Sequence, residues 1–341
     1  MFSQPSQGSA NPSASFPALW NYVEPALNHI LRSSHNGGSK APSIAVDYYS
    51  AIHTATYNFL SAQGDAAVSN HSQRLNNGRD GAEKERFLAS GCDLYEQLDR
   101  FFAEVAREIL ANAPQDDANL LHYYVPSYQR FQSGVLSIAR LLNYINRHYV
   151  KRAVDEDRGW MRLGDIVDVV AASAASARDA SDMTIRQKIA EKFRERRAEE
   201  LRKWGYTDGA ESLAQAEARA EAASSPDRII PVSSLGMRRW RTDFLEPLLA
   251  TPPALKGKGK RRGAAPDAPH KKNALPKSRL ARAVRDITAD TADPGTLNER
   301  RQLALVVYDS LADVGVRIDH PLRKKLAKFI GTPSADAPSV G

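Results

Sequence analysis

The stretch "YQRFQSGVLSIARLLNYINRHYV", residues 128–150, sets the character of this chain. Its apolar residues recur at alternating steps of three and four, the spacing that places side chains on one face of an α-helix. A stripe of this length buries a helix against its neighbours. The stripe consists of Tyr128, Phe131, Val135, Ile138, Leu142, Ile145 and Tyr149. The spacing therefore predicts a core helix in an all-α protein.

A second apolar line runs beside the first and consists of Leu141, Tyr144 and His148. The helix is thus apolar over a wider arc than one buried face needs, so either two of its sides are buried or one is an exposed patch that binds a partner. His148 has no metal-ligating neighbour three or four residues away, which favours an ordinary histidine over a metal ligand. Arg147, Lys151 and Arg152 could contact phosphates, although cations are also favoured at the C-terminal end of a helix.

Similar periodicity predicts helices along most of the chain, and no run has the alternation of a β-strand. Helices are expected around residues 20–30 and over about 43–62, 84–112, 277–290, 296–314 and 320–331. Residues 61–81 show no pattern and are predicted to form a polar loop. Successive helices of similar length suit a solenoid of helical bundles.

Composition divides the 341 residues into segments with different expected behaviour. We predict a disordered N-terminus (1–15), the main helices (16–166), a charged low-complexity helical insertion (167–232), a continuation of the bundle (233–250), a basic linker (251–276), C-terminal helices (277–331) and a disordered tail (332–341). The insertion has few large apolar anchors, so we expect it to be solvated rather than part of the core.

The net charge of +7 is concentrated in "KGKGKRRG" (256–263) and "HKKNALPKSRLAR" (270–282). Such runs are usually solvated linkers, but they can also bind acidic partners or act as a nuclear address. Cys92 is the one cysteine, which excludes an internal disulfide. No apolar run approaches the roughly 20 residues that span a bilayer, and the N-terminus lacks a secretory pattern. We expect a cytoplasmic or nuclear protein without membrane contact.

The motifs of common enzyme and cofactor sites are missing from the sequence. The glycines and lysines of "KGKGKRRG" have no flanking strand and helix to make a phosphate-binding loop, and no His-Glu-x-x-His motif occurs. Cys92 follows a glycine at a predicted helix start, but no base lies near it in the sequence. The prediction is a non-catalytic protein with no cofactor and no metal.

Four stretches resemble the N-terminal arm of the cullins, the scaffold subunits of multisubunit ubiquitin ligases, and the SCF type most closely. "YSAIHTATYNFLSA" (49–62) is similar to the aromatic-rich second helix of that family, and "GCDLYEQLDRFFAEV" (91–105) to its "G-x-x-L-Y-x-x-L" helix. "LHYYVPSYQRFQSGVLSIARLLNYINRHYVKRAVDEDR" (121–158) resembles the fifth helix with its "Y-L-N-R-H-W-V" signature, and "SLGMRRWRTDFLEPLL" (234–249) the stretch after it. The family's tryptophans are Tyr128 and Tyr149 in this chain.

The resemblance implies a cullin-repeat bundle whose second and fifth helices dock a Skp-family adaptor, which in turn carries an F-box substrate receptor. It implies a contact set of Tyr49, Ile52, His53 and Thr56 on one helix and Ser137, Leu141, Tyr144 and His148 on the other. Core packing is the alternative reading of each of these residues. The resemblance stops before the region by which cullins recruit a RING-box protein, so no RING-box binding is expected of this chain.

A rival interpretation makes the protein a basic helical nucleic-acid or chromatin binder that uses the insertion and the basic linker. Its binding would weaken steeply with salt, because phosphate contacts release counterions. Docking through an apolar patch would depend little on salt.

Overall fold

The computed structural model describes residues 2–3, 11–33, 40–75, 91–162, 164, 182–207, 210–251, 278–289 and 297–331. Within these ranges the chain is helical, and an isolated bridge between Phe2 and Ile44 is the sole β-type pairing. The predicted all-α class is confirmed. No helix in the described part has the length and apolar character needed to cross a bilayer.

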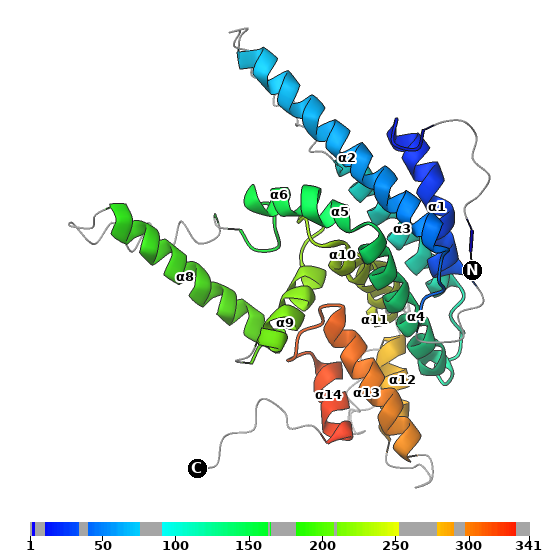
Figure 1. The fold of residues 1–341 in the computed structure, drawn as a ribbon. Helices are drawn as coiled ribbons and strands as arrows, with labels where there is room; N and C mark the ends of the chain where they lie inside the picture. The colour runs from blue at the N-terminus through cyan, green and yellow to red at the C-terminus, as the bar shows by residue number, and fades with distance from the viewer. Residues whose placement is uncertain are drawn as a thin grey trace, which may run out of the picture.

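The first half of the chain forms α1 (Phe16–Arg32), α2 (Val46–Leu75), α3 (Cys92–Ala111), α4 (Leu120–Leu141), α5 (Asn143–Ile145), a π-helical turn η1 (Asn146–Val150) and α6 (Lys151–Asp155). The second half forms α8 (Asp182–Arg202), α9 (Ala210–Ala223), α10 (Val232–Arg239), a second π-helical turn η2 (Trp240–Leu245), α11 (Glu246–Leu249), α12 (Arg279–Ile287), α13 (Leu297–Asp313) and α14 (Pro321–Ile330). Figure 1 shows α4 running through the middle of this bundle.

α4 is the central element, and it contacts α1, α10, α12 and α13. All seven residues of the predicted stripe are buried, as the spacing predicted. Trp240 of η2 seals this face, because its ring lies 4.9 Å from that of Phe131 and 4.1 Å from that of Phe244. Tyr124 and Tyr128 complete the cluster by packing edge-on against the same indole. Buried aromatic side chains of this kind dominate the energy of a core.

The helical path changes after α4. Leu142 leaves helical geometry, with φ −105° and ψ 30°, and the chain then continues through α5, η1 and α6. The side-chain oxygen of Asn146 accepts a hydrogen bond of 2.9 Å from the backbone N–H of Val232. At Gly91, with φ +95°, the backbone lies so close to Leu60 and Tyr149 that a Cβ would meet both side chains. These contacts tie η1 to α10 and to the start of α3.

α2 is longer than the sequence predicted. It continues to Leu75, through 15 of the 21 residues 61–81 that were expected to form a loop. The segment lacks a proline, and once a helix is nucleated each further residue is added at little cost. Polarity alone was therefore a poor indicator of a helix end. The start predicted for the next helix, 84–90, lies outside the described residues, and α3 is described from Cys92.

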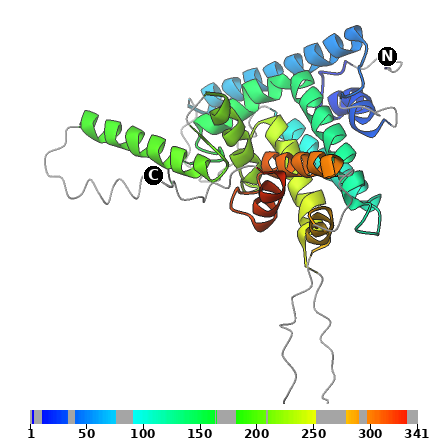
Figure 2. The same cartoon turned by 90° about the horizontal axis from the view of Figure 1, so that it is seen from below.

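The region predicted to be a solvated insertion behaves in two ways. Most described side chains of α8 are exposed, and Figures 1 and 2 show this helix projecting from the bundle. α9, in contrast, packs against α10 and α13, with Ala216, Ala220 and Ala222 buried. The expectation of a wholly solvated segment is wrong for α9, because alanines let helices approach closely without large apolar anchors. Gly315, at φ +81°, lets the backbone after α13 lie close to the end of α9, since a Cβ there would lie 2.6 Å from the backbone nitrogen of Ala223.

Several predicted segments fall largely outside the described residues. Residues 252–276 of the basic linker and the tail 332–341 are among them, so these expectations stay predictions. In the N-terminal segment expected to be disordered, the ring of Phe2 stacks on that of His29, with 4.5 Å between the ring centres. The carbonyl oxygen of Phe2 accepts a hydrogen bond from the backbone N–H of Ala45. The domain boundaries as such also stay predictions.

Glu221 gives α9 a pH-dependent attachment to α10. Its carboxylate accepts a hydrogen bond of 2.5 Å from the Ser234 hydroxyl, and burial raises its pKa from 4.5 to about 7. A carboxyl group with a raised pKa in the folded state holds its proton where the unfolded chain has released it. Stability is then lost as the pH rises from 4.5 to 7.

We predict that Glu221→Gln becomes more stable relative to the wild type as the pH rises through this window, by about 2–3 kcal/mol in total. The amide keeps an acceptor for Ser234 without carrying a charge. Urea unfolding followed by circular dichroism at pH 4.5 and pH 8 measures the difference. Glu191→Gln, on the exposed surface of α8, is the control and should show no such trend. If the free energies of unfolding of the wild type and of Glu221→Gln changed equally between pH 4.5 and pH 8, the raised pKa of Glu221 would be wrong.

Candidate functional site: an exposed aromatic patch

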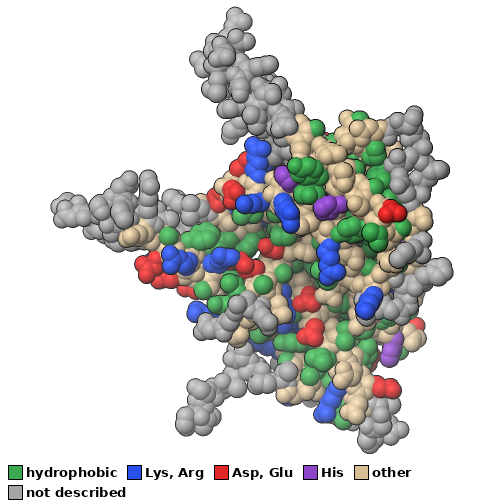
Figure 3. Space-filling model, in the orientation of Figure 1, with side chains coloured by type: hydrophobic (Ala, Val, Ile, Leu, Met, Phe, Trp, Pro, Cys, Tyr) green, Lys and Arg blue, Asp and Glu red, His purple; other side chains and the backbone are tan. Residues whose placement is uncertain are grey.

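Five rings from two parts of the chain meet on the surface between α2 and the α5–η1 segment. Tyr49, His53 and Tyr57 come from α2, whereas Tyr144 and His148 come from α5 and η1. We call these five residues the aromatic patch. The Tyr144 ring is its centre, at 4.5 Å from His53, 5.0 Å from Tyr57 and 5.8 Å from His148. In Figure 3, histidine side chains lie among hydrophobic ones over this part of the molecule.

The helical spacing of α2 explains why its aromatic residues point outward. Tyr48, Ile52, Ala55 and Phe59 form its buried side. Tyr49, His53 and Tyr57 follow each other at intervals of four on the opposite side. The rotation of the helix is fixed by Tyr48, whose hydroxyl donates a 2.6 Å hydrogen bond to the Tyr22 carbonyl and whose pKa burial raises to about 12. The outward rings are therefore held by packing on the far side of the same helix.

Cations surround the α5–η1 side of the patch. The guanidinium of Arg147 lies 5.8 Å from the centre of the Tyr144 ring, within the range of a cation–π contact. Arg140 of α4 and Lys151 of α6 are also exposed, four residues before Tyr144 and four residues after Arg147 in the chain. The surface thus combines an apolar aromatic centre with a basic edge.

The structure divides the eight residues that the resemblance implied as contacts. Tyr49, His53, Ser137, Tyr144 and His148 are accessible, which leaves them free to meet a partner. Ile52, Thr56 and Leu141 are 0%, 0% and 1% exposed, so for these three the core reading holds. Of the second apolar line of the long helix, Leu141 is thus buried, whereas Tyr144 and His148 are accessible.

Local packing explains each of the three buried positions. Leu141 lies two turns after Gly134 on α4, and at Gly134 the side chain of Leu31 comes so close that it leaves no room for a Cβ. α1 thus packs closely against α4 at Gly134, on the face of α4 that also carries Leu141. Ile52 lies on the buried side of α2, and the hydroxyl of Thr56 donates to its carbonyl oxygen at 2.8 Å. Thr56 is therefore satisfied within its own helix and needs no outside partner.

Tyr57 belongs to the patch, although the sequence did not single it out. It is 44% exposed, more than the 38% of Tyr49, and it contacts both Tyr144 and His148. The available signal was its position four residues after His53, in the same series as Tyr49. An exposed cluster of large aromatic side chains is typical of a protein-binding surface, since tyrosine offers a large rigid contact area with a polar end.

The described residues offer little for catalysis. No cluster of three or more histidine, cysteine or acidic side chains that could hold a metal occurs in the described ranges. Burial raises the pKa of the Cys92 thiol, and the Tyr149 hydroxyl lies 3.5 Å from its sulfur. A thiol with a raised pKa is a weak nucleophile.

Comparison with known proteins relates part of the chain to cullins. It is 24% identical to the cell division control protein 53 of Saccharomyces cerevisiae over 140 residues, which are 40% of this chain and 16% of that protein. It is also 24% identical to Cullin-1 of Dictyostelium discoideum over 144 residues, which are 41% of this chain and 17% of that protein. The chain thus matches a small part of the length of these relatives. No family model matches it, and no solved structure matches it either. These similarities support a distant cullin-like relation.

We predict a large loss of stability for a substitution in the core and a small one for a substitution in the patch. Leu141→Ala should lower the free energy of unfolding by about 2–5 kcal/mol, because it leaves a cavity in the core. Tyr57→Ala should lower it by at most about 1 kcal/mol, since it removes exposed ring contacts. Urea titrations of the purified variants measure both values. If Leu141→Ala were as mild as Tyr57→Ala, Leu141 would not be the core residue described above.

Proposed function

We propose that this protein is a non-catalytic scaffold arm of a cullin-type ubiquitin ligase, and that the aromatic patch binds a Skp-family adaptor carrying an F-box receptor. The adaptor would bring substrates for ubiquitin-dependent degradation. The distant similarity to Cullin-1 and to the cell division control protein 53 supports the scaffold role. We further propose that it acts in the cytoplasm or the nucleus.

One observation carries the proposal for the adaptor. The two segments that the resemblance assigns to adaptor docking are distant in the sequence, yet their accessible aromatic side chains meet in one surface, with His53 and Tyr144 at 4.5 Å. Four of the eight implied contact residues belong to this patch, and a fifth, Ser137, is accessible on α4. A patch that joins two rigid helices offers a partner a surface that is already in place before binding, so little entropy is lost in ordering it.

The expected energetics are those of a standard protein–protein interface. Such an interface buries roughly 1,600 Å² in total, and a few central aromatic residues contribute most of the binding energy. Tyr144 is the central ring of the patch, and Tyr57 contacts it at 5.0 Å. The rim cations, including Arg147, would contribute more to orientation and association rate than to affinity.

We predict that Tyr144→Lys and Tyr57→Ala each weaken binding of a Skp-family adaptor with its F-box protein by at least about 30-fold, the loss typical of a central interface residue. Co-purification and isothermal titration calorimetry measure the effect. Asn58→Ala, on an exposed position of α2 next to Tyr57 but outside the patch, is the matched control and should bind normally. Folding of each variant is checked by circular dichroism. Equal binding by all three variants would remove the patch as the docking site.

The nucleic-acid interpretation gives a different salt dependence. If the adaptor binds through the patch, its affinity should change by less than about threefold between 50 and 200 mM salt and should not depend on the basic linker, residues 251–276. Binding of duplex DNA through several phosphate contacts would fall by about 10³-fold or more over that range. Titrations of the intact protein and of the deletion variant with each ligand separate the two functions.

A further inference from the structure

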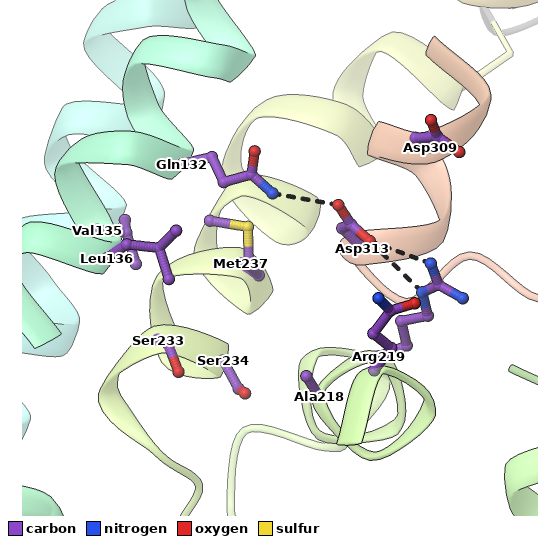
Figure 4. A pocket seen from close by; sticks show the side chains of 11 residues that line it. Gln132, Val135, Leu136, Ala218, Arg219, Ser233, Ser234, Met237, Asp309 and Asp313 are labelled. Atoms are coloured by element: carbon purple, nitrogen blue, oxygen red, sulfur yellow. Dashed lines mark hydrogen bonds and ion pairs between the residues drawn. The ribbon is translucent and has the colours of Figure 1, made fainter. Parts of the chain in front are cut away.

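A pocket of about 500 Å³ opens between four helices on another side of α4. Figure 4 shows its lining, with Gln132 and Leu136 from α4, Met237 from α10, Arg219 from α9 and Asp313 from α13. Val135, Leu136 and Met237 give it an apolar wall, whereas the α9 and α13 sides are polar. Since neither α9 nor α13 contributes to the aromatic patch, this pocket is a separate feature.

Asp313 is a structural residue of the pocket. One of its carboxylate oxygens accepts hydrogen bonds of 3.1 Å from the Tyr128 hydroxyl and 3.1 Å from the Gln132 amide. The other oxygen accepts two bonds of 3.4 Å from the guanidinium of Arg219. Asp313 thereby joins α4, α9 and α13, and its charge is balanced by Arg219.

Asp309 is the unbalanced charge of the lining. It lies one helical turn before Asp313 on the same face of α13, and its carboxylate makes no hydrogen bond or ion pair within the described part of the chain (Figure 4). Burial and the neighbouring Asp313 raise its pKa, while Arg219 and Arg323 offset part of this effect. Asp309 is exposed to solvent, so its carboxylate can meet a ligand at the pocket that it lines. A carboxylate with a shifted pKa beside a cavity is a candidate for a binding residue.

We propose that this pocket binds a lysine or arginine side chain of a partner protein. The apolar wall of Val135, Leu136 and Met237 suits the aliphatic stem of such a side chain, and Asp309 suits its cationic end. Because Arg219 and Asp313 neutralise each other, the charged lining residues carry a net charge of −1, from Asp309. An acidic side chain would be repelled, and a neutral apolar one would leave Asp309 without a counter-charge.

The methionines of the chain provide a direct probe. There are four, and of these Met237 lines this pocket while Met161 lines a different one. In protein labelled with ¹³C-methyl methionine, the Met237 signal is assigned with a Met237→Leu variant. The full chain is then titrated with the blocked peptides acetyl-Ala-Lys-Ala-amide and acetyl-Ala-Arg-Ala-amide, and with acetyl-Ala-norleucine-Ala-amide as the uncharged analogue.

We expect the lysine or the arginine peptide to shift the Met237 methyl signal saturably, with the Met161 signal unchanged and with at most a weak effect of the norleucine peptide. Asp309→Asn should weaken the apparent affinity about fivefold, the effect of one accessible ion pair. Ala218→Phe, which fills the pocket from an exposed position of α9, should abolish the shift.

Asp155→Asn is the matched control, because it removes the same charge from an exposed position on α6 outside the pocket. It should bind the peptides like the wild type. The proposal is overturned if neither cationic peptide moves the Met237 signal, if the norleucine peptide moves it equally, or if Asp309→Asn and Asp155→Asn behave alike. A failure of adaptor binding can be told apart from a failure of this proposal, because the adaptor experiment tests the aromatic patch and the Met237 signal tests this pocket.

Discussion

Burial of a single stripe along α4 and its continuation is the constraint on which the other features depend. The seven residues of the stripe are at most 3% exposed. Trp240 packs on this stripe through ring contacts with Phe131 and Phe244. Once these side chains are inside, the rotation of the helix about its axis is fixed. Each residue turns the helix by about 100°, so a shift of one residue would expose core side chains at a cost of several kcal/mol. The accessible flanks of α4 therefore face fixed directions.

The end of this helical path decides what the surface offers to a partner. The break at Leu142 and the π-helical turn keep Ile145 and Tyr149 inside while Tyr144 and His148 remain accessible beside α2. The bond from the Val232 N–H to Asn146 anchors this turn to α10, and Gly91 allows Tyr149 to pack against the start of α3. π-helical turns are frequent at functional sites, where an extra residue re-aims the side chains that follow. The aromatic patch thus owes its position to backbone contacts of residues that no partner would touch.

The sequence predicted the buried faces of helices, which follow from periodicity, but not which residues are covered by distant parts of the chain. The stripe on α4 and the all-α class could be anticipated, because step lengths of three and four report directly on helical faces. The pairing of α2 with the α5–η1 segment was implied by the resemblance to cullins and not by periodicity. Leu141 could not be separated from Tyr144, since both lie on the same apolar line and it is the tertiary packing that buries Leu141 and leaves Tyr144 accessible. α9 was taken as solvated because its buried residues are alanines. The partners of Asp313 lie more than 90 residues away in the chain, so no local pattern could reveal the pocket.

The pocket and the aromatic patch lie on different parts of the helical path that shares one buried stripe. Gln132 and Leu136 of the pocket belong to α4, whereas Tyr144 and His148 of the patch belong to α5 and η1, beyond the break at Leu142. The stripe is buried along both parts, so a ligand at either place meets side chains whose backbone is already held by the core. Coupling between the two places would require an element with two packed arrangements. The pocket and the patch are thus separate surfaces positioned by the same buried stripe.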